Sequence, residues 1–329
     1  MLSRRQNLLE TIRGGKPDRF VNRFEAFALI AGGPENVHRP PMKPGMEIVN
    51  EWGVTIRFKE GQPGPFPVHD EEHKVLKDIT QWEKYVKAPH LEDSAEVWKD
   101  ARAQADAVDR KEQFVTWFGF PGIFEQLHYL MGIDDTLINF YEEPEAMHEL
   151  INYITDWKLE YARLVCKYVQ PEALFHHDDW GTQISSFISP QMFAEFIAPY
   201  FKKLYGYYKA NGCELIIHHS DSYAANLVPS MIDMGIDIWQ GCMSTNNTPE
   251  LIKKYGGQIS FMGDIDNGVV DVPDWTPELI ARETERACRN CGKLYFIPCT
   301  TMGGPESTHP GVYETVGKEI ERMSKIMFG

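Results

Sequence analysis

Short apolar runs alternate with helix-like stretches over the last two-thirds of the chain. The runs are rich in β-branched and aromatic residues, which is typical of buried parallel strands; they lie at 114–118, 173–176, 214–218, 236–240, 259–262 and 294–298. The stretches between them predict helices at 121–131, 144–168, 224–234, 249–255 and 277–288, and Ser189 caps another that starts at Pro190. Together with an extended run at 20–27, this alternation predicts a (β/α)8 barrel.

The first third of the chain follows a different pattern. A first helix ends near Gly14, and residues 32–67 are rich in Pro and Gly, with one strand-like piece at 54–58. Polar helical segments follow from 79 to 110, with a helix entry at 91–94. A connection as long as 32–67 is usually functional. We therefore predict one α/β domain over residues 1–329, a TIM barrel in which residues 1–112 form N-terminal helices and an elaborated cap.

Composition and charge limit which binding partners and which cellular compartment we expect. The net charge of −15 repels polyanions, so we expect no binding to nucleic acid. No apolar stretch approaches the roughly 20 residues that span a bilayer, and the start of the chain lacks the apolar core of a signal peptide. We expect a cytoplasmic protein that does not bind membranes, with its six cysteines reduced. A cysteine with a functional role would then be a metal ligand or a nucleophile rather than part of a disulfide.

Two segments repeat one arrangement of polar side chains. Residues 174–180 and 216–222 each begin as an apolar run, end in His-His and continue with an acidic residue. An apolar run that turns polar is typical of a barrel strand that reaches its functional end. Because neighbouring side chains of a strand point to opposite faces, only one of His218 and His219 can face the barrel interior, and we favour His219. The pattern predicts a metal or acid–base site at the barrel mouth.

Several segments resemble the uroporphyrinogen decarboxylase superfamily. They lie at 16–19, 51–54, 178–183, 187–190, 216–221, 261–266 and 297–305. The resemblance covers nearly the whole chain and implies a (β/α)8 barrel. It implies one of two chemistries: metal-free decarboxylation of porphyrinogen acetates, or zinc-assisted methyl transfer to or from a thiol or a corrinoid protein.

The segment near the first predicted strand favours the second chemistry. The decarboxylases of the family carry an Arg-Gln-Ala-Gly-Arg segment there, whereas this chain has Val21-Asn-Arg-Phe-Glu-Ala26, with one arginine. Bidentate guanidinium pairing is the efficient way to hold the many carboxylates of a porphyrinogen. A chain of net charge −15 without such a clamp is a poor porphyrinogen binder.

The methyltransferase branch implies the metal ligands. That branch uses a His-x-Cys motif and a later cysteine, and this chain has His219-Ser-Asp221 and Cys299 at those places. Zinc prefers four donors, and Cys242, after another strand, is the fourth candidate. Oxygen in place of sulfur would give a harder zinc site. The alternative is that none of the four binds a metal: the histidine would be a hydrogen-bonded core residue, the aspartate a helix cap and the cysteines small buried side chains. Of the four candidate ligands, Cys242 is the least secure.

Four further residues are candidates for substrate contacts. Asp179 follows its strand directly and could accept a proton, Trp180 could stack on a ring, and Gln183 lies in the same segment. The alternative is a helix-capping acid beside an anchoring tryptophan. Glu25 is a weaker candidate. His177 and His176 are more often core residues, or residues that support a ligand from behind, than ligands themselves.

The leading hypothesis is a zinc-dependent methyltransferase that works with a partner corrinoid (cobalamin) protein. It would remove a methyl group from a small methyl donor such as an aryl methyl ether, as an O-demethylase component, with zinc as Lewis acid. The alternative is a cofactor-free decarboxylase of a small carboxylated substrate, in which Asp179 stabilises a protonated intermediate. A third hypothesis is a noncatalytic barrel that binds a ligand or a subunit. The substrate, the direction of methyl transfer and the oligomeric state are left open.

Overall fold

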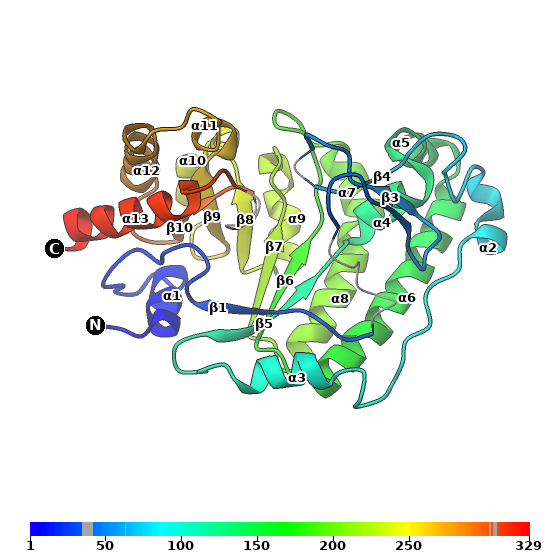
Figure 1. The fold of residues 1–329 in the computed structure, drawn as a ribbon, viewed down its shortest axis with the longest axis horizontal. Helices are drawn as coiled ribbons and strands as arrows, with labels where there is room; N and C mark the ends of the chain where they lie inside the picture. Colours follow the sequence, from blue (N-terminus) through cyan, green and yellow to red (C-terminus); the bar gives the residue numbers. More distant parts are fainter. Residues whose placement is uncertain (35–41, 63, 303, 305–307) are drawn as a thin grey trace.

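A parallel sheet of seven strands forms the centre of the molecule (Figure 1). The structure is a computed structural model and describes residues 1–34, 42–62, 64–302, 304 and 308–329. The strands follow one another in chain order across the sheet, which curls like a section of a barrel. They are β1 (Phe27–Ile30), β5 (Phe114–Gly119), β6 (Ala173–His177), β7 (Leu215–His219), β8 (Ile238–Cys242), β9 (Ser260–Ile265) and β10 (Phe296–Thr300).

Helices connect the strands and cover the outer face of the sheet. Ser189 caps α7, as the sequence predicts, and Thr276 caps α12; each helix has a proline in its first turn. The helices after β5 are α4 (Ile123–Met131), α5 (Ile133–Glu142), α6 (Pro144–Tyr168), α7 (Pro190–Phe196), α8 (Ala198–Ala210), α9 (Val228–Asp233), α10 (Thr248–Tyr255), α11 (Asn267–Val270), α12 (Pro277–Cys291) and α13 (Val312–Phe328). Short 3-10 turns precede α9 and α10 at Ala225–Leu227 and Ser244–Asn246.

The predicted strand at 20–27 is wrong. Residues 20–26 contain a turn in which Arg23 takes a positive φ of 56° and the Glu25 side chain accepts a hydrogen bond from the Asn22 N–H at 2.9 Å. A left-handed residue cannot continue an extended ladder, so β1 begins only at Phe27. Among the described residues the sheet has seven strands, with β1 and β10 at its two edges. An eighth strand of the predicted barrel is not found there.

A second, small sheet lies within the predicted cap region. It is antiparallel and contains β2 (Glu47–Val49), β3 (Thr55–Arg57) and β4 (Phe66–Pro67). Residues 35–41 and 63 of the predicted cap loop lie outside the described residues. The remaining N-terminal helices are α1 (Arg4–Ile12), a 3-10 turn (Ile79–Gln81), α2 (Trp82–Tyr85) and α3 (Lys99–Asp106). The helix predicted to enter at 91–94 therefore begins later, at Lys99.

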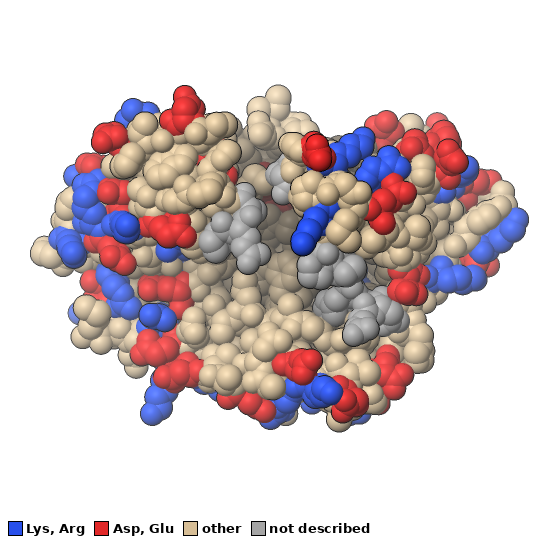
Figure 2. All heavy atoms as spheres, in the orientation of Figure 1, with Lys and Arg blue, Asp and Glu red and all other residues tan. Residues whose placement is uncertain are grey.

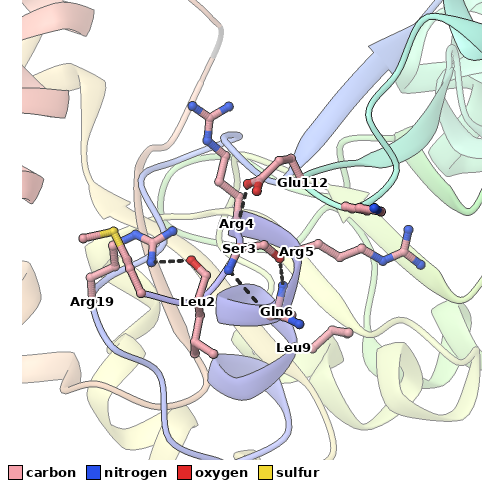
Figure 3. Close-up of a pocket in the computed structure, with 10 residues that line it drawn as sticks. Leu2, Ser3, Arg4, Arg5, Gln6, Leu9, Arg19 and Glu112 are labelled. Carbon is pink, nitrogen blue, oxygen red and sulfur yellow. Dashed lines mark hydrogen bonds between the residues drawn. The ribbon is translucent and has the colours of Figure 1, made fainter.

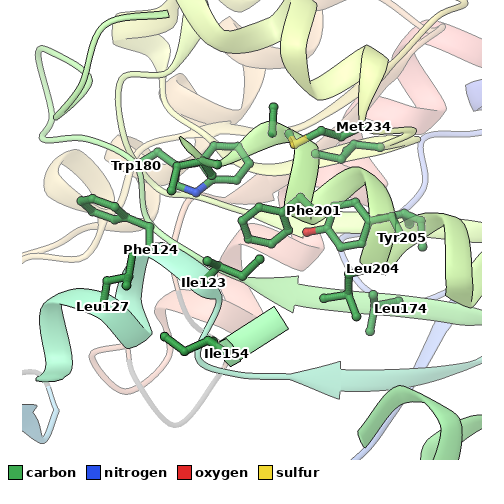
Figure 4. Close-up of a cluster of buried hydrophobic side chains, with 14 of the residues drawn as sticks. Ile123, Phe124, Leu127, Ile154, Leu174, Trp180, Phe201, Leu204, Tyr205 and Met234 are labelled. Atoms are coloured by element: carbon green, nitrogen blue, oxygen red, sulfur yellow. The ribbon is translucent and has the colours of Figure 1, made fainter. Parts of the chain in front are cut away.

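Alternating side chains of β6, β7 and β8 enter two different cores. Phe175, Ile217 and Ile238 belong to the core on the inner face of the curled sheet. Their neighbours Leu174 and Ile216 belong to the core between the sheet and the helices, some of which is shown in Figure 4. On β6 and β7 this period of two continues to the strand ends and decides which polar side chains reach the inner face, whereas β8 has an irregularity between Gln240 and Cys242. No helix within the described ranges is long and apolar enough to cross a membrane.

Candidate metal centre at the carboxyl ends of β6 and β7

The two His-His pairs lie side by side, because β6 and β7 are in register: His177 pairs with His219, and His176 with His218. His176 and His218 point to the outer face, where both Nδ1 atoms contact the Tyr205 hydroxyl, at 3.0 and 2.7 Å. Both are buried. These outer histidines are hydrogen-bonded core residues.

The inner histidines form a different group. The rings of His177 and His219 are stacked with centroids 4.4 Å apart. His219 Nε2 lies 4.0 Å from Asp179 Oδ1. One ligand atom from each of His177, Asp179 and His219 lies within 4.8 Å of the others, which would allow them to hold one ion. Two imidazoles and a carboxylate are a donor set that zinc and other divalent transition metals accept.

Each inner histidine has a partner on its Nδ1 atom. His177 Nδ1 lies 3.1 Å from Glu125 Oε2, on α4. His219 Nδ1 makes a short hydrogen bond with Oε1 of Gln240, on β8. Histidines that bind metals usually donate their second N–H in this way, which fixes the ring and its tautomer. In this geometry Nε2 is the nitrogen that each ring has left for an ion.

Burial and charge shift the pKa values of these groups in opposite directions. Burial alone lowers the pKa of His177, but the Glu125 and Asp179 carboxylates outweigh it and raise it to about 10. Burial, aided by the nearby charge of His177, lowers the pKa of His219 to about 4. Burial and then the Asp179 charge raise the pKa of Asp221 to about 8. Without a metal, the cluster thus holds protons that a divalent cation would displace.

A buried carboxylate joins the strand end to helix α4. Asp178 accepts hydrogen bonds from the backbone N–H groups of Phe124 and Glu125 at 3.0 and 2.7 Å, and thereby caps the helix. A Cβ on Gly122 would lie 2.2 Å from the Asp178 side chain, so only glycine fits at the helix entry. The cap places Glu125 against His177.

A buried ammonium group balances some of this charge. Lys158 of α6 donates a hydrogen bond to the Pro121 carbonyl. Burial lowers its pKa to about 8, against the charges of Asp178 and Glu125, which raise it. Its amine remains largely protonated at neutral pH, and its positive charge lies near the carboxyl groups of Asp178 and Glu125.

The four ligands predicted from the sequence do not form one metal-binding group among the described residues. Asp221 is adjacent to the cluster, and its backbone N–H donates to Asp179 Oδ1 at 3.1 Å. Cys299 belongs to the inner core, where its thiol is fully buried. Cys242 lies on the outer face, with its sulfur 3.4 Å from the Thr248 hydroxyl. Of the four predicted ligands, His219 alone is a member of the observed triad.

The substrate candidates are placed in three different surroundings. Asp179 is in the triad, and Gln183 is exposed in the loop after β6, where its carbonyl accepts from Thr245. Trp180 does not line the site. Its ring is buried against His218, with centroids 3.8 Å apart, and beside Phe201 (Figure 4). Its indole N–H donates to Asp178.

Glu25 lies at the opposite end of the sheet. Its carbonyl accepts from the Gln113 side chain, just before β5 begins. A pocket at this amino end, lined by the start of α1 with Arg19 and Glu112, is shown in Figure 3. Its polar groups already bond one another: the Arg4 backbone N–H donates to Glu112, and Arg19 to the Leu2 carbonyl. The Glu25 carboxylate is itself near Arg4 and the Asn22 N–H, and it is not a member of the triad.

Sequence reasoning missed three residues of the site. His177 was not expected to be a ligand, although the in-register pairing of two His-His strands places it beside His219. Gln240 could have been found by the same alternation, because it has the strand parity of Ile238 on the inner face. Glu125 belongs to a helix, and no pattern in the sequence indicates its contact with His177.

Comparisons with known proteins agree with this fold. The family model described as uroporphyrinogen decarboxylase (URO-D) matches residues 47–305. A methyltransferase from Methanosarcina mazei has a similar structure, with a TM-score of 0.67 and 12% identity over 98% of this chain and 99% of that chain. No curated protein sequence matches the chain.

Proposed function

The chain belongs to the uroporphyrinogen decarboxylase family, and from that premise we propose that it is a metal-dependent methyltransferase. The observation that carries the proposal is the triad of His177, Asp179 and His219 at the carboxyl ends of two adjacent barrel strands. Barrel enzymes place their chemistry at this end. The structural similarity to a methyltransferase supports the choice of reaction.

The donor set of the triad fits zinc, with at least one position left for a substrate oxygen or sulfur. When bound, the ion supplies Lewis acidity that stabilises an oxygen leaving group or a thiolate. Glu125 and Gln240 hold the two imidazole rings in place through their Nδ1 atoms. Asp221, whose carboxyl pKa of about 8 keeps a proton near the site, is placed to give that proton to a departing oxygen.

The methyl group is proposed to move between a small methylated compound, such as an aryl methyl ether, and a corrinoid protein that docks at the mouth. Figure 2 shows the molecule hollowed near its centre, between the side that carries the small sheet and the side that carries α10 to α13. A docked partner would deliver its cobalt above this hollow and exclude water from the reacting methyl group.

Metal analysis of two variants tests the proposal and separates the two ligand sets. The parent should bind one zinc per chain. Asp179→Asn removes a ligand and should weaken zinc binding by more than the roughly 10- to 100-fold typical of losing an outer partner of a ligand, whereas Cys299→Ser, which changes the buried thiol of the family motif, should bind zinc as the parent does. Loss of zinc in Cys299→Ser alone would favour the sequence-derived set of His219, Asp221, Cys242 and Cys299. A parent that binds no zinc would contradict both sets.

A second candidate, metal-free decarboxylation, is favoured by one observation. The pKa of His177 is raised to about 10, since the nearby Glu125 and Asp179 charges outweigh burial, so an imidazolium faces the site at neutral pH. Such a cation can bind the carboxylate of a substrate. This candidate requires release of CO2 from a small carboxylated substrate by protein stripped of metal, with no partner protein added. Activity that depends on added zinc would exclude it.

A further inference from the structure

Gln240 connects a member of the triad to the end of a distant strand. It lies on β8, its side chain is buried with 1% exposure, and it reaches His219 on β7 in one direction. In the other direction its Nε2 atom lies 3.3 and 3.4 Å from the carbonyl oxygens of Thr300 and Thr301, at the end of β10. The buried amide of this glutamine is therefore hydrogen-bonded at both its oxygen and its nitrogen, as buried polar groups usually are.

The partners of Gln240 fix the orientation of its amide. Backbone carbonyl oxygens accept hydrogen bonds and cannot donate them. The amide NH2 must therefore face Thr300 and Thr301, because the reverse orientation would place two acceptors against each other. The carbonyl oxygen of the side chain is then the atom that faces His219.

This orientation also fixes the tautomer of His219. An acceptor at Gln240 Oε1 requires a proton on His219 Nδ1. A neutral imidazole with its proton on Nδ1 has its lone pair on Nε2, the atom that lies 4.0 Å from Asp179. Metal ions bind the deprotonated nitrogen of an imidazole, so this tautomer is the one that a ligand at the triad requires.

We infer that Gln240 is a positioning residue that holds His219 in the tautomer able to bind the metal. The inference rests on the proposed function for its purpose, whereas the tautomer itself does not depend on a metal. Gln240 takes the place that a carboxylate or a backbone carbonyl occupies behind many metal-binding histidines. An amide is neutral and can also donate, so it tethers the ring to the end of β10 at the same time.

Two substitutions of Gln240 separate positioning from packing. Gln240→Met keeps the length of the side chain and removes its hydrogen bonds to His219 and to the Thr300 and Thr301 carbonyls. Gln240→Glu keeps an acceptor for His219 Nδ1 but turns oxygens toward the Thr300 and Thr301 carbonyls, which disturbs packing more. We expect Gln240→Met to weaken zinc binding about 10- to 100-fold and Gln240→Glu to stay within a few-fold of the parent. Gln126→Met, a change at a buried glutamine of α4 outside the site, is the matched control and should bind zinc like the parent.

The second readout is nitrogen NMR of histidine-labelled, metal-free protein, in which the two ring nitrogens report the tautomer. The His219 signal, assigned by its loss in His219→Ala, should show Nδ1 protonated in the parent and in Gln240→Glu, and a mixture of tautomers in Gln240→Met. An Nε2-protonated ring in the parent would overturn the inference, as would equal losses of zinc affinity in Gln240→Met and Gln240→Glu. If the parent binds no zinc, the proposed function fails, and the NMR result alone decides the role of Gln240.

Discussion

The inner and the outer histidines of β6 and β7 come from the same dipeptide and have opposite surroundings. His176 and His218 share one tyrosine hydroxyl within the outer core, and their pKa values fall well below the usual range because they are buried. His177 and His219 face each other and a carboxylate, with their Nδ1 atoms bound to Glu125 and Gln240. A shift of one residue along a strand thus separates a structural imidazole from a candidate metal ligand.

The largest expected effect comes from replacing one histidine of each kind on β7. His219→Ala should lose zinc at micromolar metal while remaining folded, because it removes one of three ligands. His218→Ala should retain zinc but lose about 2–4 kcal/mol of unfolding free energy, since it empties a buried site and leaves the Tyr205 hydroxyl without that partner. Zinc titration and urea unfolding measure the two effects. Equal loss of zinc in both variants would contradict the distinction between the two faces.

An intermediate effect is expected in the pH dependence of the metal-free protein. The pKa of His177 is about 10 in the folded state, because the nearby carboxylates outweigh burial, and 6.5 is its ordinary value. The stabilisation is therefore complete below pH 6.5 and is lost as the pH rises toward 10. It amounts to at most about 5 kcal/mol, since one pKa unit corresponds to about 1.4 kcal/mol. His177→Gln should lose less stability than the parent between pH 6.5 and 10 in urea titrations. Parallel curves for the two proteins would show that His177 is not held as a cation.

The smallest expected effect concerns the outer face alone. Tyr205→Phe removes the hydroxyl that both outer histidines contact, at a cost of about 1–3 kcal/mol. Zinc affinity should not change, because neither outer histidine touches the triad. Calorimetric unfolding gives the first quantity and competition with a chromogenic chelator gives the second. A clear loss of zinc affinity would mean that the outer layer positions the inner one.

The sequence predicts the strands of the regular region of the chain well, because each is a short apolar run bounded by turn residues. The predicted strand at 20–27 fails for a local reason, since the positive φ of Arg23 interrupts it before β1 begins. Arginine gives no signal of such a conformation in a single sequence. The region predicted to form a cap contains long Pro- and Gly-rich connections, and the path of such connections depends on contacts that no periodicity in the sequence reveals.

The residues of the candidate site that lie at the ends of strands could be predicted from the sequence. Asp179 and His219 follow from the repeated His-His pattern and the strand period of two. Trp180 was misplaced because an aromatic residue after a strand has the same pattern whether it packs inward or toward the helices. Glu125 approaches His177 only through the packing of α4, which is set by the cap that Asp178 provides. Contacts between elements of this kind are not encoded in spacing.

The cap that Asp178 forms on α4 has a consequence for how the site can open. Two backbone N–H groups of the helix and the strand end that carries His177 and Asp179 are joined through one buried side chain. A displacement of α4 relative to the strand end would break these two hydrogen bonds at a fully buried side chain, so the cap ties the helix to the strand end. We therefore expect a substrate to enter the hollow without moving α4 away from the strand end that carries His177 and Asp179.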